Sequence, residues 1–282
     1  MSRWSASRWF APRLRVELRP GSLALVRRAA LAGSRVRSTR AVPVEISASN
    51  GETATEPWRA AVDALIEALR ELRGAVGQVE IVLSDHFVRY LLIPWSAELV
   101  GDSERLSFAQ LAFRDLYGQL ADTWDLCLDE QPAGQASFAC AVDRALASSL
   151  RDAVERAGAQ LSALMPSLAD CINRHRSALK APEFCMAVCE PGRISLALRA
   201  RHGWATVRSR RVDGTLADVL PTLLKQEMAV GDVTQGGVLY VCTDDAPDAA
   251  PFAVPGWRTV RLAERGAFKK PAGEHTVLAA EG

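Results

Sequence analysis

The stretch that decides the fold is VCEPGRISLALRARHGWATVRSRR, residues 188–211. Pro191-Gly192 separates a run of small and apolar residues from the alternating run RISLALRA, and His202-Gly203 separates that run from WATVRSRR. Alternation with a period of two residues is typical of strands with one buried face, and Pro-Gly is typical of turns. The stretch therefore predicts a three-stranded antiparallel unit.

A second copy of this pattern lies near the N-terminus, in RVELRPGSLALVRRA (residues 15–29). In both copies an apolar strand is followed by Pro-Gly, an alternating run around Leu-Ala-Leu, and arginine. An internal repeat predicts two lobes of one topology. Chance similarity is the alternative, because hairpins converge on Pro-Gly turns.

The rest of the chain alternates predicted helices and strands. Strands are expected on both sides of Ser84-Asp85, and helices at 58–72, 104–120, 144–158, 168–179 and 215–230. Residues 159–167 read as a strand. In the second helix the spacing places one set of apolar residues on a common face: Leu106, Phe113, Leu116 and Leu120. The order predicts an α/β fold with mixed sheets and helices on their faces, and does not fit a barrel of eight βα units.

Composition and charge narrow the function classes. The formal net charge of 282 residues is +1, which gives no global electrostatic case for nucleic acid. No apolar run approaches the roughly 20 residues that span a bilayer, and the start has no secretory signal pattern. None of the six cysteines forms a CxxC pair, and we expect no histidine near them at metal-ligand spacing, so the sequence predicts reduced thiols and no metal site.

Several segments resemble segments of a known family, and they follow one another in the same order along the chain. These are VEIVLSDHFVRYLLIPW, SERLSFAQLAFRDLYG, the run from Phe138 to His175, and the second hairpin. Together they are similar to the actin-like cytoplasmic proteins of type IV pilus and type II secretion platforms, the PilM and GspL type. The resemblance implies an α/β, two-lobed actin-like (ribonuclease H-like) fold with mixed sheets and an inserted subdomain.

The resemblance also implies a division of the chain. Residues 1–12 are expected as a basic, aromatic arm, 13–158 as the first lobe, 159–268 as the second lobe and 269–282 as a loose tail. The inserted subdomain is expected at about 95–145.

In nucleotide-binding relatives both hairpin turns read Asp-x-Gly with small polar residues, whose N–H groups and carboxylate hold phosphate and magnesium. This chain departs from that pattern, because proline removes a donor at each turn. The corresponding residues are read as a vestigial cofactor site: Glu17, Gly21, Ser22, Glu190, Gly192 and Arg193. Glu17 and Glu190 are expected as solvated strand ends, with metal-facing carboxylates as the alternative. The sequence thus predicts no cofactor and no catalytic residue; the alternative is an active ATPase or small kinase with ATP and magnesium.

The function implied is a non-catalytic adaptor at the inner face of the inner membrane. Its partners would be the cytoplasmic segment of a bitopic inner-membrane protein and an assembly ATPase. Asp125, Asp129 and Glu130 are expected to form an acidic rim on a peptide-binding strand edge. The arm residues Arg3, Trp4, Arg8 and Trp9 would contact lipid headgroups or an acidic partner, a solvated tail being the alternative. Ser84, Asp85 and His86 read as a turn rather than a catalytic triad.

Overall fold

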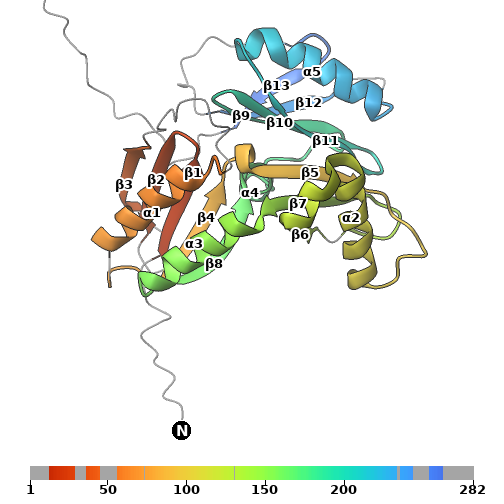
Figure 1. Ribbon diagram of the computed structural model, residues 1–282. Coiled ribbons are helices and arrows are strands. Elements are labelled where there is room, and N and C mark those ends of the chain that lie inside the picture. The colour runs from red at the N-terminus through yellow and green to blue at the C-terminus, as the bar shows by residue number, and fades with distance from the viewer. Residues whose placement is uncertain are drawn as a thin grey trace, which may run out of the picture.

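The computed structural model describes residues 13–28, 36–44, 56–72, 74–129, 131–233, 236–243 and 254–262. These residues form two five-stranded sheets and one three-stranded sheet, with helices packed on their faces (Figure 1). The α/β class with mixed sheets is confirmed.

The first sheet has the strand order β3-β2-β1-β4-β8. Its strands are β1 (Arg13–Arg19), β2 (Ser22–Arg28), β3 (Val36–Pro43), β4 (Gln78–Leu83) and β8 (Gln160–Pro166). β1 runs antiparallel to β2 and parallel to β4. Helices α1 (Arg59–Glu71) and α3 (Arg144–Arg156) bury their apolar faces in the same core cluster as Leu14, Val16 and Leu18 of β1.

The second sheet repeats this topology in the order β11-β10-β9-β12-β13. Its strands are β9 (Phe184–Glu190), β10 (Arg193–Ala200), β11 (Gly203–Arg211), β12 (Val238–Thr243) and β13 (Arg258–Arg261), with α5 (Leu216–Val230) between β11 and β12. The two hairpins close alike: Val44 N donates to Gly21 O at 3.1 Å, and Val212 N donates to Gly192 O at 3.0 Å. Gly192 has φ +71°, a conformation that favours glycine. The predicted repeat is confirmed.

One predicted boundary is wrong. Residues 159–167 were assigned to the second lobe, but β8 pairs with β4 in the first sheet, for example Ile81 with Leu164. Helix α4 (Ser167–Arg174) follows and contacts β4, β8 and β9. The strand belongs with the first lobe because its parallel partner is there, and sequence order alone did not reveal that partner.

At the place expected for the inserted subdomain, about 95–145, the structure has a three-stranded sheet with the order β5-β7-β6; it begins earlier than expected, at Val88, and we keep the name inserted subdomain for it. It comprises β5 (Val88–Ile93), α2 (Asp102–Tyr117), β6 (Trp124–Leu128) and β7 (Ser137–Asp143), with 3-10 turns η2 (Asp85–Phe87) and η3 (Gly118–Thr123). Phe113 of α2 is fully buried against one face of this sheet, edge-on to Trp124 at 6.2 Å.

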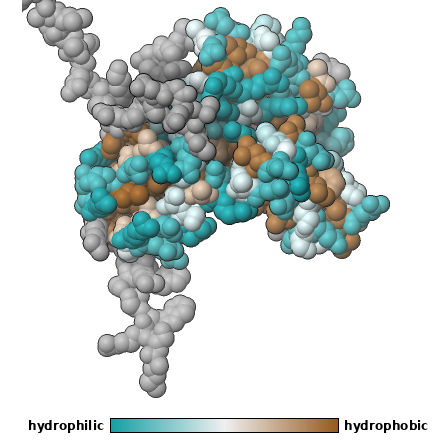
Figure 2. Space-filling model, viewed as in Figure 1, coloured by the Kyte–Doolittle hydropathy of each residue, from teal (hydrophilic) through white to brown (hydrophobic). Residues whose placement is uncertain are grey.

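The predicted buried face of α2 is wrong in part. Phe113 is buried, but Leu106 and Leu116 are 41% and 57% exposed, and Leu120, 60% exposed, lies beyond the helix in η3. A small sheet covers only a narrow stripe of the helix, around Ala109 and Phe113. Figure 2 shows apolar residues at the corner of the molecule that α2 forms. Within the ranges given above, no helix is both long enough and apolar enough to cross a membrane.

Candidate functional sites between the lobes and beside the inserted subdomain

Residues 84–86, which follow β4, contact both hairpins. Ser84, which follows β4, donates its N–H to Leu18 O near the end of β1 at 2.8 Å. The next residues reach the second hairpin, since His86 Nε2 lies 3.0 Å from Pro191 O. The two hairpins therefore approach each other at residues 84–86, where the two lobes meet.

The carboxylate of Glu190, which is 6% exposed, lies at this contact between the lobes. Oε2 accepts hydrogen bonds from Ser84 Oγ at 2.6 Å and from Asp85 N at 3.1 Å. Oε1 accepts a hydrogen bond from Ser167 Oγ at 2.8 Å. We call this set the Glu190 bridge, because its acceptor comes from the second lobe and its three donors come from β4's end and the start of α4. Hydrogen bonds to an ionised group are the stronger kind.

A second carboxylate, Asp85, is fully buried beside the bridge. Its Oδ1 accepts hydrogen bonds from Tyr90 Oη at 2.5 Å and from Leu168 N at 3.3 Å. Burial, together with the nearby Asp85 charge, raises the pKa of Tyr90 well above its usual value. Tyr90 therefore remains a proton donor and holds the carboxylate in place.

The polar face of β1 is also buried, under α4. Arg15 contacts Asp170 of α4 at 2.6 Å, Glu80 at 2.8 Å and Glu17 at 3.3 Å. Burial disfavours the charged guanidinium, but the hydrogen bond and charge of Asp170, with the other carboxylates, outweigh it and raise the pKa of Arg15. This network fixes α4 against the first sheet.

The expectation that Glu17 and Glu190 are solvated strand ends is wrong. Glu17 is 3% exposed because Arg15 holds it under α4, and Glu190 is buried in the bridge. Of the other turn residues, Gly21 and Gly192 are exposed and Ser22 is half-buried. Arg193 donates from Nη1 to Ser209 Oγ at 3.0 Å, and burial lowers its pKa.

Two lobes whose sheets have one topology, with their first hairpins meeting at residues 84–86, decide the fold class. The fold is actin-like. The cytoplasmic domain of EpsL, an inner-membrane component of the type II secretion system of Vibrio cholerae, has TM-score 0.57 and 14% identity over 92% of this chain and 93% of that chain. A Bacteroides thetaiotaomicron protein with an actin-like ATPase fold and unknown function has TM-score 0.60 and 13% identity over 88% and 87%.

A PilM-PilN type IV pilus biogenesis complex is also similar, with TM-score 0.58 and 15% identity over 84% of this chain and 82% of that chain. No protein-family model and no curated protein sequence matches the chain. The likeness to the three solved structures is one of fold, and it confirms the actin-like fold that the sequence resemblance implied.

A second candidate site is an apolar groove where the inserted subdomain, α4 and the second lobe meet. Its volume is about 290 Å³. One wall is the sheet face carrying the cross-strand neighbours Tyr90, Cys140 and Cys127, and the opposite wall includes Leu168 and Ile172 of α4. Trp204 of β11 also lines the groove, packed edge-on against Phe138 at 4.6 Å.

The acidic residues predicted to form one rim at the strand edge do not all line the groove. Asp129 lines the groove, and β6 beside it is an edge strand of its sheet. Asp125 lies outside the groove lining and forms an ion pair with Arg144 at 2.8 Å. Glu130 and the arm residues Arg3, Trp4, Arg8 and Trp9 lie outside the described residues.

The groove also contains an exposed thiol, Cys127. Its cross-strand neighbour Cys140 is half-buried, and a hydrogen bond from the Cys140 thiol lowers the pKa of Cys127 to about 6. Because Cys127 is exposed and lines the groove, its thiol is a chemical reporter for the groove.

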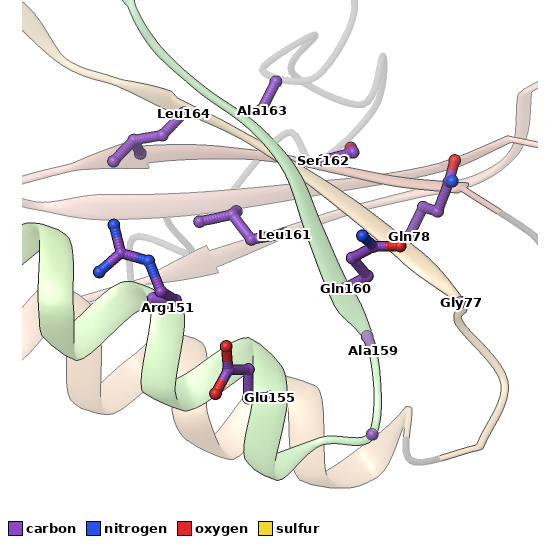
Figure 3. Close-up of a pocket in the computed structure, with 11 residues that line it drawn as sticks. Gly77, Gln78, Arg151, Glu155, Ala159, Gln160, Leu161, Ser162, Ala163 and Leu164 are labelled. Carbon is purple, nitrogen blue, oxygen red and sulfur yellow. The ribbon is translucent and has the colours of Figure 1, made fainter.

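A larger cavity of about 680 Å³ lies elsewhere, along β8 at the edge of the first sheet. Figure 3 shows β8 crossing beside α3, with Arg151 and Glu155 on the helix and Leu161 on the strand. Its lining contains no residue of the Glu190 bridge, so cavity volume alone would point to a different part of the molecule. The sequence reasoning missed Tyr90, Ser167 and Asp170; of these only Ser167, the first residue of α4, had a signal in its position at a helix end.

Ser84, Asp85 and His86 each make a different contact in the structure. Ser84 Oγ donates to Glu190, whereas the His86 ring contacts Pro191 O, so no imidazole nitrogen of His86 pairs with the Ser84 hydroxyl.

Proposed function

We propose that this chain is a non-catalytic adaptor of a pilus or type II secretion-like assembly platform at the inner face of the inner membrane. In this role it binds the cytoplasmic segment of a bitopic membrane protein, with an assembly ATPase as a further partner. The observation that carries the proposal is the Glu190 bridge. The similar structures, an inner-membrane component of a type II secretion system and a PilM-PilN complex, support the class of assembly.

The bridge argues against nucleotide turnover on electrostatic grounds. A phosphate site needs several N–H and hydroxyl donors and a place for a hydrated magnesium ion. Here Ser84, Asp85 N–H and Ser167 donate to Glu190 instead. Pro20 and Pro191 supply no N–H at the turns. A triphosphate would have to displace a carboxylate of its own sign from three hydrogen bonds.

The groove supports the part of the proposal that concerns binding of a peptide segment. An edge strand offers backbone hydrogen bonds to an extended peptide, and side-chain pockets beside it supply selectivity. The groove walls are mainly apolar, and Asp129 adds an acid at the rim. We therefore expect a segment with an apolar side chain for the groove and a basic residue for Asp129.

Alkylation of Cys127 tests this binding directly. The probes are synthetic peptides of the cytoplasmic segments of any bitopic membrane proteins encoded beside this chain, with scrambled peptides as controls. Bound peptide should slow modification of Cys127 by iodoacetamide several-fold at saturation, because the thiol lies in the groove. If the peptide binds and leaves the rate unchanged, the groove is not the site; if no such peptide binds, the adaptor role is wrong.

Charge reversal separates groove binding from general attraction. Asp129→Lys should weaken binding by about tenfold and flatten its dependence on salt, because a rim charge contributes electrostatic attraction. The matched control is Asp63→Lys, an exposed position on α1. Equal weakening in both variants would contradict a specific role for Asp129.

Nucleotide binding is tested by thermal unfolding with millimolar ATP and magnesium. We expect no change in Tm, since stabilisation by a ligand follows RT ln(1 + [L]/Kd). A rise of several degrees that is lost in Gly192→Val would restore the alternative, an active ATPase or small kinase.

A further inference from the structure

Three side chains that are far apart in the sequence converge beneath α4: Cys171, His175 and Cys242. One sulfur from each cysteine and one ring nitrogen of His175 all lie within 4.8 Å of one another. Cys171 and His175 are one helical turn apart at the end of α4, and Cys242 lies near the end of β12 in the second lobe. The expectation that no histidine lies near a cysteine at metal-ligand spacing is therefore wrong.

The chemistry of this set suits a thiophilic cation. Both cysteines are 0% exposed. Nε2 of His175 is inaccessible to solvent and makes no hydrogen bond within the described part of the chain. A buried ring nitrogen without a hydrogen bond is costly, and an ion is one of the few partners that explain it. Zn²⁺ is bound by thiolate sulfur at about 2.3 Å and imidazole nitrogen at about 2.0–2.1 Å, so its ligands must converge in this way.

Charge balance favours the same ion. Two thiolates and a neutral imidazole bring a charge of −2, which a divalent cation cancels, so the occupied site has no net charge in an apolar environment. Burial alone keeps a thiol protonated: desolvation raises the pKa of the buried Cys185 thiol, for example. A soft ion that forces deprotonation is therefore more consistent with this cluster than a hard ion such as Mg²⁺.

We propose that Cys171, His175 and Cys242 form a zinc site that joins α4 to the second-lobe strand β12. Three protein ligands leave one corner of the tetrahedron for a water molecule. The ion would hold the two lobes together at a point separate from the Glu190 bridge. This proposal is independent of nucleotide or peptide binding, because none of its ligands lies in the groove or in the bridge.

The test uses the full chain, stripped of metal with a chelator and kept reduced with a phosphine, which offers no competing thiol. Zn²⁺ should bind with a stoichiometry of one per chain and raise Tm by about 5–10 °C, whereas Mg²⁺ should not. Co²⁺ should give thiolate charge-transfer absorption, and proton release should accompany binding. Cys242→Ser should lose the absorption band and the Tm shift.

The matched control is Cys185→Ser, which removes another fully buried thiol outside the cluster and should keep zinc binding. Because buried cysteine variants can fail to fold, His175→Gln provides a second test at a half-buried position and should weaken zinc binding at least tenfold. The proposal is overturned if the wild-type chain binds no Zn²⁺ at micromolar concentration. It is also overturned if binding persists in Cys242→Ser, or if a Cys171–Cys242 disulfide forms equally fast with and without zinc.

Discussion

Removing the Glu190 carboxylate should uncouple the two lobes. Glu190→Ala leaves the hydroxyls of Ser84 and Ser167 and the N–H of Asp85 without the acceptor that they share. Hydrogen bonds to a charged group contribute about 1.5–3 kcal/mol each, and buried charged networks are not additive. We therefore expect the free energy of unfolding to fall by about 3–5 kcal/mol.

Glu190→Gln is a milder variant, which removes the charge of the side chain and keeps its ability to form hydrogen bonds. Its amide oxygen can still accept from Ser84 and Asp85, and the Ser167 hydroxyl can rotate to accept from the new NH₂ group. Only the charge assistance is lost, so the expected decrease is about 1 kcal/mol. The matched control is Glu183→Ala, which removes an exposed ion pair with Arg201 and should cost no more than about 1 kcal/mol.

The assay is urea unfolding followed by far-ultraviolet circular dichroism and by tryptophan fluorescence. If the bridge couples the lobes, the unfolding curves measured by circular dichroism and by fluorescence should coincide in the wild type and separate in Glu190→Ala. The apparent m-value of the variant should also fall, since less surface is exposed in each step. A Glu190→Ala variant as stable as the wild type, or no less stable than Glu183→Ala, would refute the reasoning.

Three further predictions concern single positions. Burial lowers the pKa of His86, so the unfolded chain takes up its proton first; stability should fall as pH drops below the ordinary value of 6.5, and His86→Gln should reduce that decline in unfolding measured from pH 7 to pH 5. Phe113→Ala should lower the free energy of unfolding by about 3–5 kcal/mol in urea, because the ring is fully buried against the inserted sheet. Gly203→Ala should cost about 1–3 kcal/mol in the same assay, because φ is +123° and a Cβ would lie 3.2 Å from Gln135 Oε1; Gln135→Gly should remove only the steric part of that cost.

The fold was predictable where a local pattern had a single interpretation. The two Pro-Gly hairpins are adjacent in sequence to the strands that they join, so alternation and turn chemistry sufficed to predict both three-stranded units. The assignment of β8 failed because its parallel partner β4 is encoded far upstream. The buried face of α2 was partly wrong because periodicity identifies an apolar stripe but not the width of the surface that covers it.

The candidate sites were less predictable than the fold. Glu190 was identified at its turn, yet its donors Ser84 and Ser167 come from two other segments, so its burial could not be inferred from the hairpin alone. The Cys171 and His175 pair had a local signal, the spacing of one helical turn, but Cys242 joins it only through the docking of the two lobes.

The hairpin formed by β10 and β11 is anchored at both of its ends. At one end the turn after β9 carries the Glu190 bridge, and at the other Trp204 packs on Phe138 of the inserted subdomain. Eight residues of strand span about 26 Å. A rotation of about 5° around either anchor would move the other by about 2 Å, enough to break a hydrogen bond. Rotation of this hairpin about one anchor therefore has to break the other, and a displacement applied at the groove should pass to the second lobe as the movement of one stiff body.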